Sequence, residues 1–79
     1  MTKRQKMIME IVDFVQEKGG FGIMFNDVKA LKGENVLFQL FPGEVRISIE
    51  GRTMDDDKQV TFQYLSDEVL EEIIEQMEA

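Results

Sequence analysis

The chain has 79 residues, a net charge of −7, and neither cysteine nor histidine. A chain of this length forms one domain and buries about 60–65% of the surface that its unfolded form exposes, so we expect modest stability. The composition excludes disulfide bonds and the thiolate or imidazole metal sites that depend on these two residue types.

The charge is divided unevenly along the chain. Residues 1–43 carry six basic and five acidic side chains, whereas residues 44–79 carry three basic and eleven acidic ones. Direct binding to nucleic acid requires a basic surface, so we do not expect it here. No segment approaches the ~20 apolar residues that span a bilayer, and no signal-peptide pattern follows the basic N-terminus. We therefore predict a cytoplasmic protein that has no membrane contact.

The first predicted element is a helix over residues 4–18. Met7 and Phe14 flank an apolar stripe with the i, i+3, i+4, i+7 spacing of a helix that packs on one side, made of Ile8, Ile11, Val12 and Val15. Gly19-Gly20 ends the helix, because glycine accepts the left-handed conformation found there.

Basic residues precede and begin this helix, namely Lys3, Arg4 and Lys6. Positive charge is unfavourable beside the positive end of a helix dipole. This end of the helix is therefore expected either to fray or to pair with acidic neighbours.

A strand is predicted from residue 21, with Phe21, Ile23 and Phe25 on one face and Gly22 and Met24 on the other. Residues 26–33 allow two interpretations. Either Asn26 caps a single helical turn that Gly33 closes, or the strand continues to residue 30 and turns back through residues 32–35. We favour the longer strand, residues 21–30, with a tight hairpin.

Three further strands are predicted, over residues 36–41, 44–50 and 59–65. Pro42-Gly43 separates the first two, because proline cannot donate to a ladder and Pro-Gly favours a turn. Residues 51–58 form a polar loop before the last strand, which alternation predicts to have inward side chains at Val60, Phe62 and Tyr64.

The last element is a helix over residues 66–78. Ser66 is a favourable N-cap, and Leu65 and Leu70 have the spacing of a hydrophobic staple. Its predicted buried stripe consists of Val69, Leu70, Ile73, Ile74 and Met77.

These elements predict an α+β fold with the order α-β-β-β-β-α in a single domain, residues 1–79. Short turns between successive strands favour a four-stranded antiparallel meander. The outer faces of the last two strands are polar, so both helices should pack on one face of the sheet. Because every connection reverses direction, the helices should run antiparallel to each other.

This arrangement leaves the second face of the sheet without a covering helix. Leu37 and Phe41 lie on that face of the central strand, so we predict a protein contact there, with a second copy of the chain or with another protein. A stable interface buries about 800 Å² on each partner, which requires polar neighbours to contribute. The predicted contact residues are Met24, Leu37, Gln39, Phe41, Arg46 and Gln63. The opposing interpretation is that residues 26–33 fold across the patch.

The last helix supplies an alternative function. Glutamates at successive turns cost about 0.2–0.5 kcal/mol per like-charge pair, and no lysine or arginine offsets them. Such a surface suits an acidic inhibitor that mimics nucleic acid and binds a basic protein cleft, as some phage proteins do. Its residues are Glu68, Glu71, Glu72, Glu75 and Glu78.

No motif for catalysis or for a cofactor stands out. The usual general base and the strongest nucleophile are missing, and Ser48 and Ser66 have structural explanations as a strand residue and a helix cap. Asp55 and Asp57 alternate in a cluster that could bind a hard cation, but the glycine and the later glutamate of a calcium loop are missing. We expect a non-enzymatic protein without a cofactor.

Overall fold

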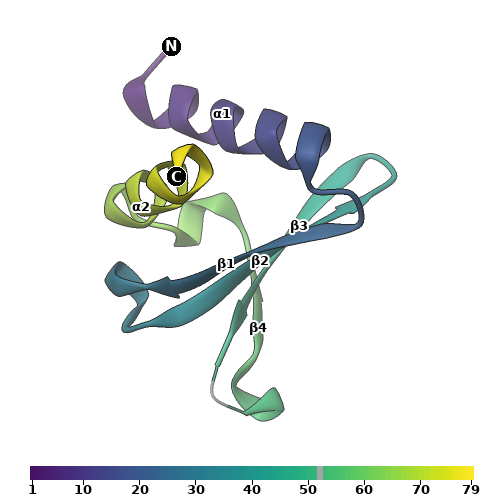
Figure 1. The fold of residues 1–79 in the computed structure, drawn as a ribbon, viewed down its shortest axis with the longest axis vertical. Helices are drawn as coiled ribbons and strands as arrows, with labels where there is room; N and C mark the ends of the chain where they lie inside the picture. Colours follow the sequence, from purple (N-terminus) through teal and green to yellow (C-terminus); the bar gives the residue numbers. More distant parts are fainter. Residues whose placement is uncertain (52) are drawn as a thin grey trace.

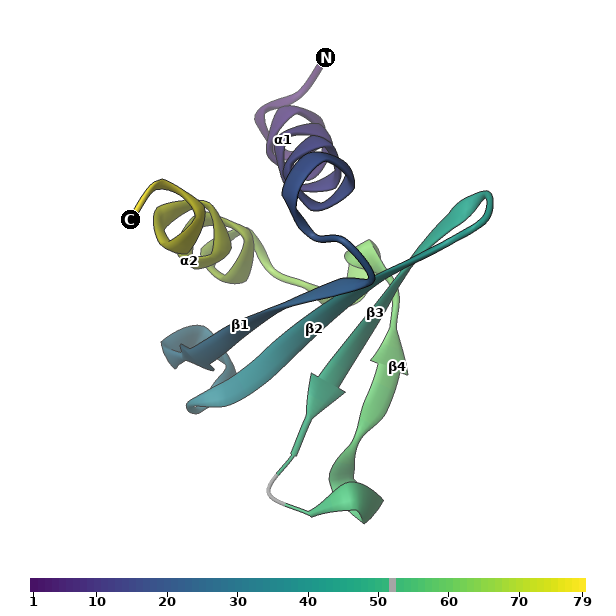
Figure 2. The ribbon, with the colours of Figure 1, turned by 45° about the vertical axis from the view of Figure 1, so that its right-hand side comes forward.

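The computed structural model describes residues 1–51 and 53–79 and confirms the predicted α+β fold. Four strands pair antiparallel in the order β1-β2-β3-β4, with a helix before and a helix after them. Both helices lie on the same face of the strongly twisted sheet, as Figures 1 and 2 show. Arg52, in the predicted polar loop, lies outside the described residues.

Helix α1 covers Lys3–Lys18 and begins with a capping box at Thr2. Thr2 Oγ1 accepts the Gln5 backbone N–H at 3.1 Å, and Gln5 Oε1 accepts the Thr2 N–H at 2.8 Å. The helix is rotated relative to the prediction, because its buried residues are Met7, Ile11 and Val15. The predicted core residues Ile8 and Val12 are therefore only half-buried.

The segment between the first two strands follows neither predicted alternative fully, because the strand stops short of residue 30 and the helical turn after it has its N-cap at Val28 and not at Asn26. Strand β1 covers Gly22–Val28, and the 3₁₀ turn η1 follows at Lys29–Leu31. Asp27 has a φ of 53°, and the register of β1 against β2 shifts between Phe25 and Val28. This irregularity bends the chain out of the sheet, so the strand ends before residue 30.

Strands β2, Glu34–Phe41, and β3, Glu44–Glu50, form a hairpin whose pairing runs from Asn35 opposite Glu50 to Phe41 opposite Glu44. Gly43 has a φ of 81° in the turn, a conformation that favours glycine over any residue with a Cβ. Strand β2 lies between β1 and β3, so its alternate side chains Val36 and Phe38 are completely buried on the helix side.

The prediction for the last strand was partly wrong. Strand β4 covers only Lys58–Val60, and the chain then forms a 3₁₀ turn, η3, at Phe62–Tyr64. Phe62 still reaches the core, where its ring centroid lies 5.9 Å from that of Phe38. Tyr64, which was predicted to point inward, is 56% exposed, because the turn breaks the alternation of the strand.

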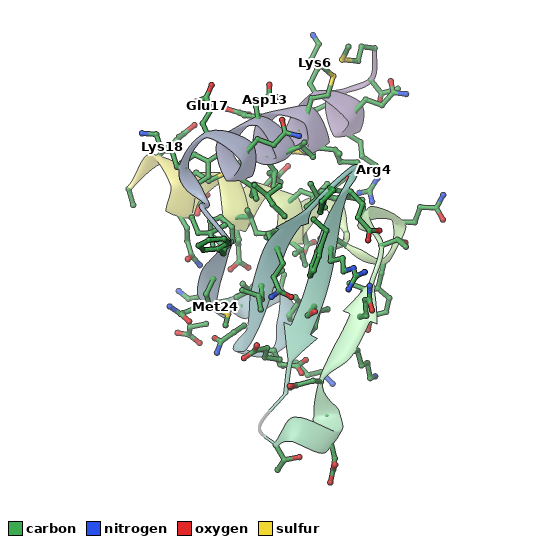
Figure 3. The ribbon with its side chains drawn as sticks, turned by 90° about the vertical axis from the view of Figure 1, so that its right-hand side faces the viewer. Arg4, Lys6, Asp13, Glu17, Lys18 and Met24 are labelled. Atoms are coloured by element: carbon green, nitrogen blue, oxygen red, sulfur yellow. The ribbon has the colours of Figure 1, made fainter. Side chains whose placement is uncertain are left out.

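Helix α2, Asp67–Glu78, begins as predicted with Ser66 as its N-cap, whose Oγ accepts the Val69 N–H at 3.3 Å. The two helices run in the same general direction, and the antiparallel prediction was wrong. Lys3 and Arg4, at the start of α1, contact Glu71 and Asp67 near the start of α2. In Figure 3 both helices run from right to left above the sheet. The prediction assumed a simple reversal after the last strand, whereas η3 lies between β4 and α2.

Arg4 connects the beginning of the chain to the turn before α2. Its guanidinium donates to the backbone O of Phe62 at 2.7 Å, to that of Leu65 at 2.6 Å, and to Asp67 Oδ1 at 2.7 Å. The basic end of α1 therefore pairs with acidic and carbonyl groups, one of the two outcomes expected from the sequence.

The core lies between the two helices and the inner face of the sheet. Phe38 is fully buried at its centre, with its ring 5.6 Å from that of Phe25 in an edge-to-face arrangement. Among the residues whose burial the structure describes, thirteen buried apolar residues make up this core. None of the described helices has the length and apolar composition that crossing a membrane requires.

Candidate functional site

The outer sheet face is the surface of β1–β3 that points away from the helices. Cross-strand pairing aligns Met24 with Leu37, Leu37 with Ser48, and Ser48 with Gln59, so these side chains form one row across the face. Two residues further along β2, Gln39 pairs with Arg46 on the same face. Met24, Leu37, Gln39, Phe41 and Arg46 thus lie on the face to which the sequence assigned them.

The outer sheet face is not sealed by residues 26–33. The turn η1 bends to the helix side, where the Glu72 carboxylate accepts the backbone N–H of Lys29 at 2.8 Å and of Ala30 at 2.7 Å. Figures 1 and 2 show no other described segment across this face.

Phe41 and Arg46 form the end of the face beside the β2–β3 turn. The guanidinium carbon of Arg46 lies 3.9 Å from the centroid of the Phe41 ring, and its Nε donates to Glu44 Oε1 at 3.0 Å. Such a cation–π contact contributes about 0.5–1 kcal/mol at an exposed site. It holds the Phe41 ring in place, although 37% of the residue is exposed.

Gln63, the sixth predicted contact residue, does not belong to the outer sheet face. It lies in η3 and not on a strand, because β4 ends at Val60. In the register that pairs Ser48 with Gln59, a strand continued to residue 65 would have placed Gln63 opposite Glu44 on this face, but β4 ends three residues earlier. The prediction for Gln63 was therefore wrong in its geometry.

A groove that the sequence did not predict lies between α1 and the β2–β3 hairpin. It has a volume of about 570 Å³, and Phe41 forms part of its wall. Phe41 therefore joins the outer sheet face to the groove. The other lining residues are Ile8, Val12, Gln16, Leu40, Gly43, Glu44, Val45 and Phe62. The half-buried Ile8 and Val12, which the spacing assigned to the core, lie along one side of this groove.

Two of the five predicted acidic-surface residues have partners within the chain. Glu71 pairs with Lys3 at 3.3 Å, and Glu72 accepts the two N–H groups of η1. Glu68, Glu75 and Glu78 are exposed on α2. Glu71 and Glu72 thus have partners within the chain, whereas Glu68, Glu75 and Glu78 lie on the exposed surface of α2.

The exposed acidic groups of α2 continue onto α1. Glu78 shares a shallow groove with Glu10, Asp13 and Glu17, and its apolar floor is formed by Phe14 and Met77. Lys18 also lies on this groove, and Figure 3 labels it beside Asp13 and Glu17 on the outer side of α1. The acidic surface is therefore wider than the last helix alone.

The aspartates of the polar loop hold the loop together. Asp57 accepts the Gly51 N–H at 3.0 Å, and Asp56 accepts the Thr53 hydroxyl at 3.1 Å. Within the described residues, no group of three acidic side chains has the arrangement of a metal site. The hydrogen bonds favour a structural role for this cluster.

Comparison of the chain with protein-family models, with curated proteins and with solved structures gave no match. Inferences about function therefore rest on the surfaces described above.

Proposed function

We propose that the chain is a small non-enzymatic interaction module that binds a partner protein around Phe41. The observation that carries this proposal is that Phe41 belongs both to the outer sheet face and to the groove beneath α1. The outer sheet face reaches it through Leu37 and Gln39, and the groove beneath α1 reaches it through Leu40 and Val45. A half-exposed aromatic ring beside an apolar groove is a typical centre for a protein interface.

The charge of the molecule supports a partner segment that combines basic and apolar side chains. The groove is lined by one carboxylate, that of Glu44, which already pairs with Arg46 at 3.0 Å, so the attraction to a basic partner comes from the rest of the chain. The whole chain has a net charge of −7, which attracts a basic partner and accelerates its association at low salt. Apolar anchors of the partner would occupy the groove, and its basic groups would face the acidic surroundings.

A displayed peptide library, selected on the immobilised chain, tests this proposal. We expect the enriched peptides to combine apolar and basic residues and to bind Phe41→Asp at least about tenfold more weakly than the native chain. The matched control is Phe21→Asp, the same change at a phenylalanine that is 97% exposed and lies outside the groove. Equal binding to Phe41→Asp and to the native chain, measured by fluorescence anisotropy, would contradict the proposal.

A second candidate function is an acidic inhibitor that occupies a basic cleft in place of nucleic acid. The observation that favours it is the joining of α2 and α1 carboxylates around the groove at Phe14 and Met77. Glu71 and Glu72 are unsuitable for testing it, because their carboxylates already have partners within the chain.

The test of this alternative is displacement of fluorescent duplex DNA from a panel of DNA-binding proteins. If the function is correct, Glu68, Glu75 and Glu78 changed together to glutamine should weaken displacement by about tenfold, and salt should weaken it steeply. The control carries the same charge change on the sheet, at Glu34, Glu44 and Glu50. Equal loss in both triple variants would show an effect of net charge alone and would argue against a specific acidic surface.

A further inference from the structure

Strand β1 forms one margin of the sheet, and its backbone there is partly open. It pairs with β2 on one side only, and Figure 3 shows it with Met24 at the edge of the sheet. On the other side, the Gly22 N–H donates to Gly19 O at 2.8 Å, and Asn26 O accepts from Gln76 Nε2 at 2.9 Å. The two ends of this edge therefore have partners within the chain.

The groups between these two ends point outward as well. Neighbouring residues of a strand direct their N–H and C=O groups to opposite sides. The Gly22 N–H bonds to Gly19 and the Asn26 C=O bonds to Gln76, both away from β2, so the even-numbered residues of this stretch face outward. By this alternation the Met24 N–H, the Met24 C=O, the Gly22 C=O and the Asn26 N–H point away from β2, and among the described residues they bond to no segment outside the sheet.

This edge lacks the features that usually protect an open strand. Residues 19–26 contain no charged residue and no proline, and Phe21 at the entrance to β1 is 97% exposed. The opposite margin differs, since β4 has only three residues and begins with Lys58. An unprotected edge next to an exposed aromatic residue indicates a place where another strand pairs.

We propose that two copies of the chain pair antiparallel through β1, about a twofold axis at Met24, to form one continuous sheet. In this register the N–H of each Met24 donates to the C=O of the other Met24, and each Asn26 N–H donates to the Gly22 C=O of the second copy. The Gly22 N–H and the Asn26 C=O would oppose each other across the axis. These two groups already have partners within the chain. In the dimer, every outward group that lacks such a partner therefore gains one from the second copy.

The side chains around Met24 also favour a second copy of the chain as the partner of β1. Met24 and Leu37 are half-buried on the outer sheet face, and the twofold axis places each Met24 beside its counterpart, which extends the apolar row across both sheets. The uncharged segment lets two chains of charge −7 approach there. A strand of five residues buries much less than about 800 Å² per partner, so the dimer is weak and added salt strengthens it by screening the repulsion.

Sedimentation equilibrium of the full chain, from about 10 µM to about 1 mM, tests the proposal. We expect the mass to rise toward that of a dimer, more so at high salt. Met24→Pro removes the outward donor and leaves the β1–β2 ladder intact, since proline is tolerated where the N–H of an edge strand faces solvent. This variant should associate at least about tenfold more weakly, whereas Met24→Leu, which keeps the N–H, should associate like the native chain.

Two further measurements keep the test decisive. If Met24→Pro does not fold by circular dichroism, Met24→Lys replaces it, because it places like charges on both sides of the axis. Amide exchange of the native chain should slow at Met24 and Asn26 as the concentration rises. A chain that stays monomeric, or a dimer that survives Met24→Pro, would overturn the proposal.

The inference is independent of the partner site around Phe41. Phe41→Asp should weaken peptide binding without changing the dimer. If Phe41→Asp dissociates the dimer and Met24→Pro does not, self-association runs through the outer sheet face and the edge pairing is wrong.

Discussion

Replacing Phe38 with alanine should lower the free energy of unfolding by about 3–5 kcal/mol, the largest effect that we expect of any single substitution. The residue is fully buried on the central strand, and its ring contacts the rings of both Phe25 and Phe62. Alanine would leave a cavity where β1, β2 and η3 meet. A 79-residue domain has about 4–12 kcal/mol of stability, so this variant should be close to unfolding.

Urea denaturation followed by circular dichroism measures this loss. The control is Phe21→Ala, which makes the same chemical change at a residue that is 97% exposed, and it should alter stability by less than about 0.5 kcal/mol. Similar midpoints for the two variants would mean that Phe38 is not at the centre of the core.

Replacing Arg4 with methionine should cost about 2–3 kcal/mol, far more than is usual for a charged residue near a chain end. The guanidinium bonds to the carbonyl oxygens of Phe62 and Leu65 and to Asp67, and two thirds of the Arg4 side chain is shielded, with 33% exposed. Methionine keeps the apolar stem but leaves those two carbonyls without their donor. The turn η3 and the start of α2 should loosen together.

The matched control for Arg4 is Lys3→Met in the neighbouring residue. Lys3 and Glu71 are 79% and 50% exposed, so their ion pair should contribute at most about 0.5 kcal/mol. Thermal unfolding followed by calorimetry compares the two variants. An equal effect of both would show that Arg4 acts only as a surface charge.

Much of the fold followed from local patterns in the sequence. The stretch from Val45 to Ile49 alternates so regularly that its strand and its inner face could be assigned directly, and Ser66 marked the start of the last helix. Both signals depend only on residues within a few positions of each other. The meander then followed from the short turns.

The features of the fold that were predicted wrongly depended on contacts between distant parts of the chain. Thr61 to Tyr64 alternates as a strand would, but Phe62 packs on Phe38 from a turn, and Arg4 fixes that turn from 58 residues away. No local pattern encodes a guanidinium that binds backbone carbonyls so distant in sequence. The direction of α2 follows from this turn and was missed for the same reason.

In the candidate site, too, some features followed from local patterns and others depended on packing between distant segments. Five of its predicted residues lie on the outer sheet face, because the two-residue period of β2 and β3 fixes which side chains share a face. The groove beneath α1 was missed because the rotation of a helix about its axis is set by packing and not by spacing. Ile8 and Val12 fit the buried stripe as well as Met7 does, yet they line the groove.

The shortness of β4 limits how large an assembly this fold can build. Its ladder with β3 involves only Lys58, Gln59 and Val60, and 3₁₀ turns precede and follow it. A filament of laterally joined sheets grows only if each added subunit offers a second long, uncharged edge. Once both copies of β1 are joined, no such edge is left within the described residues, so the fold favours a closed pair over polymerisation.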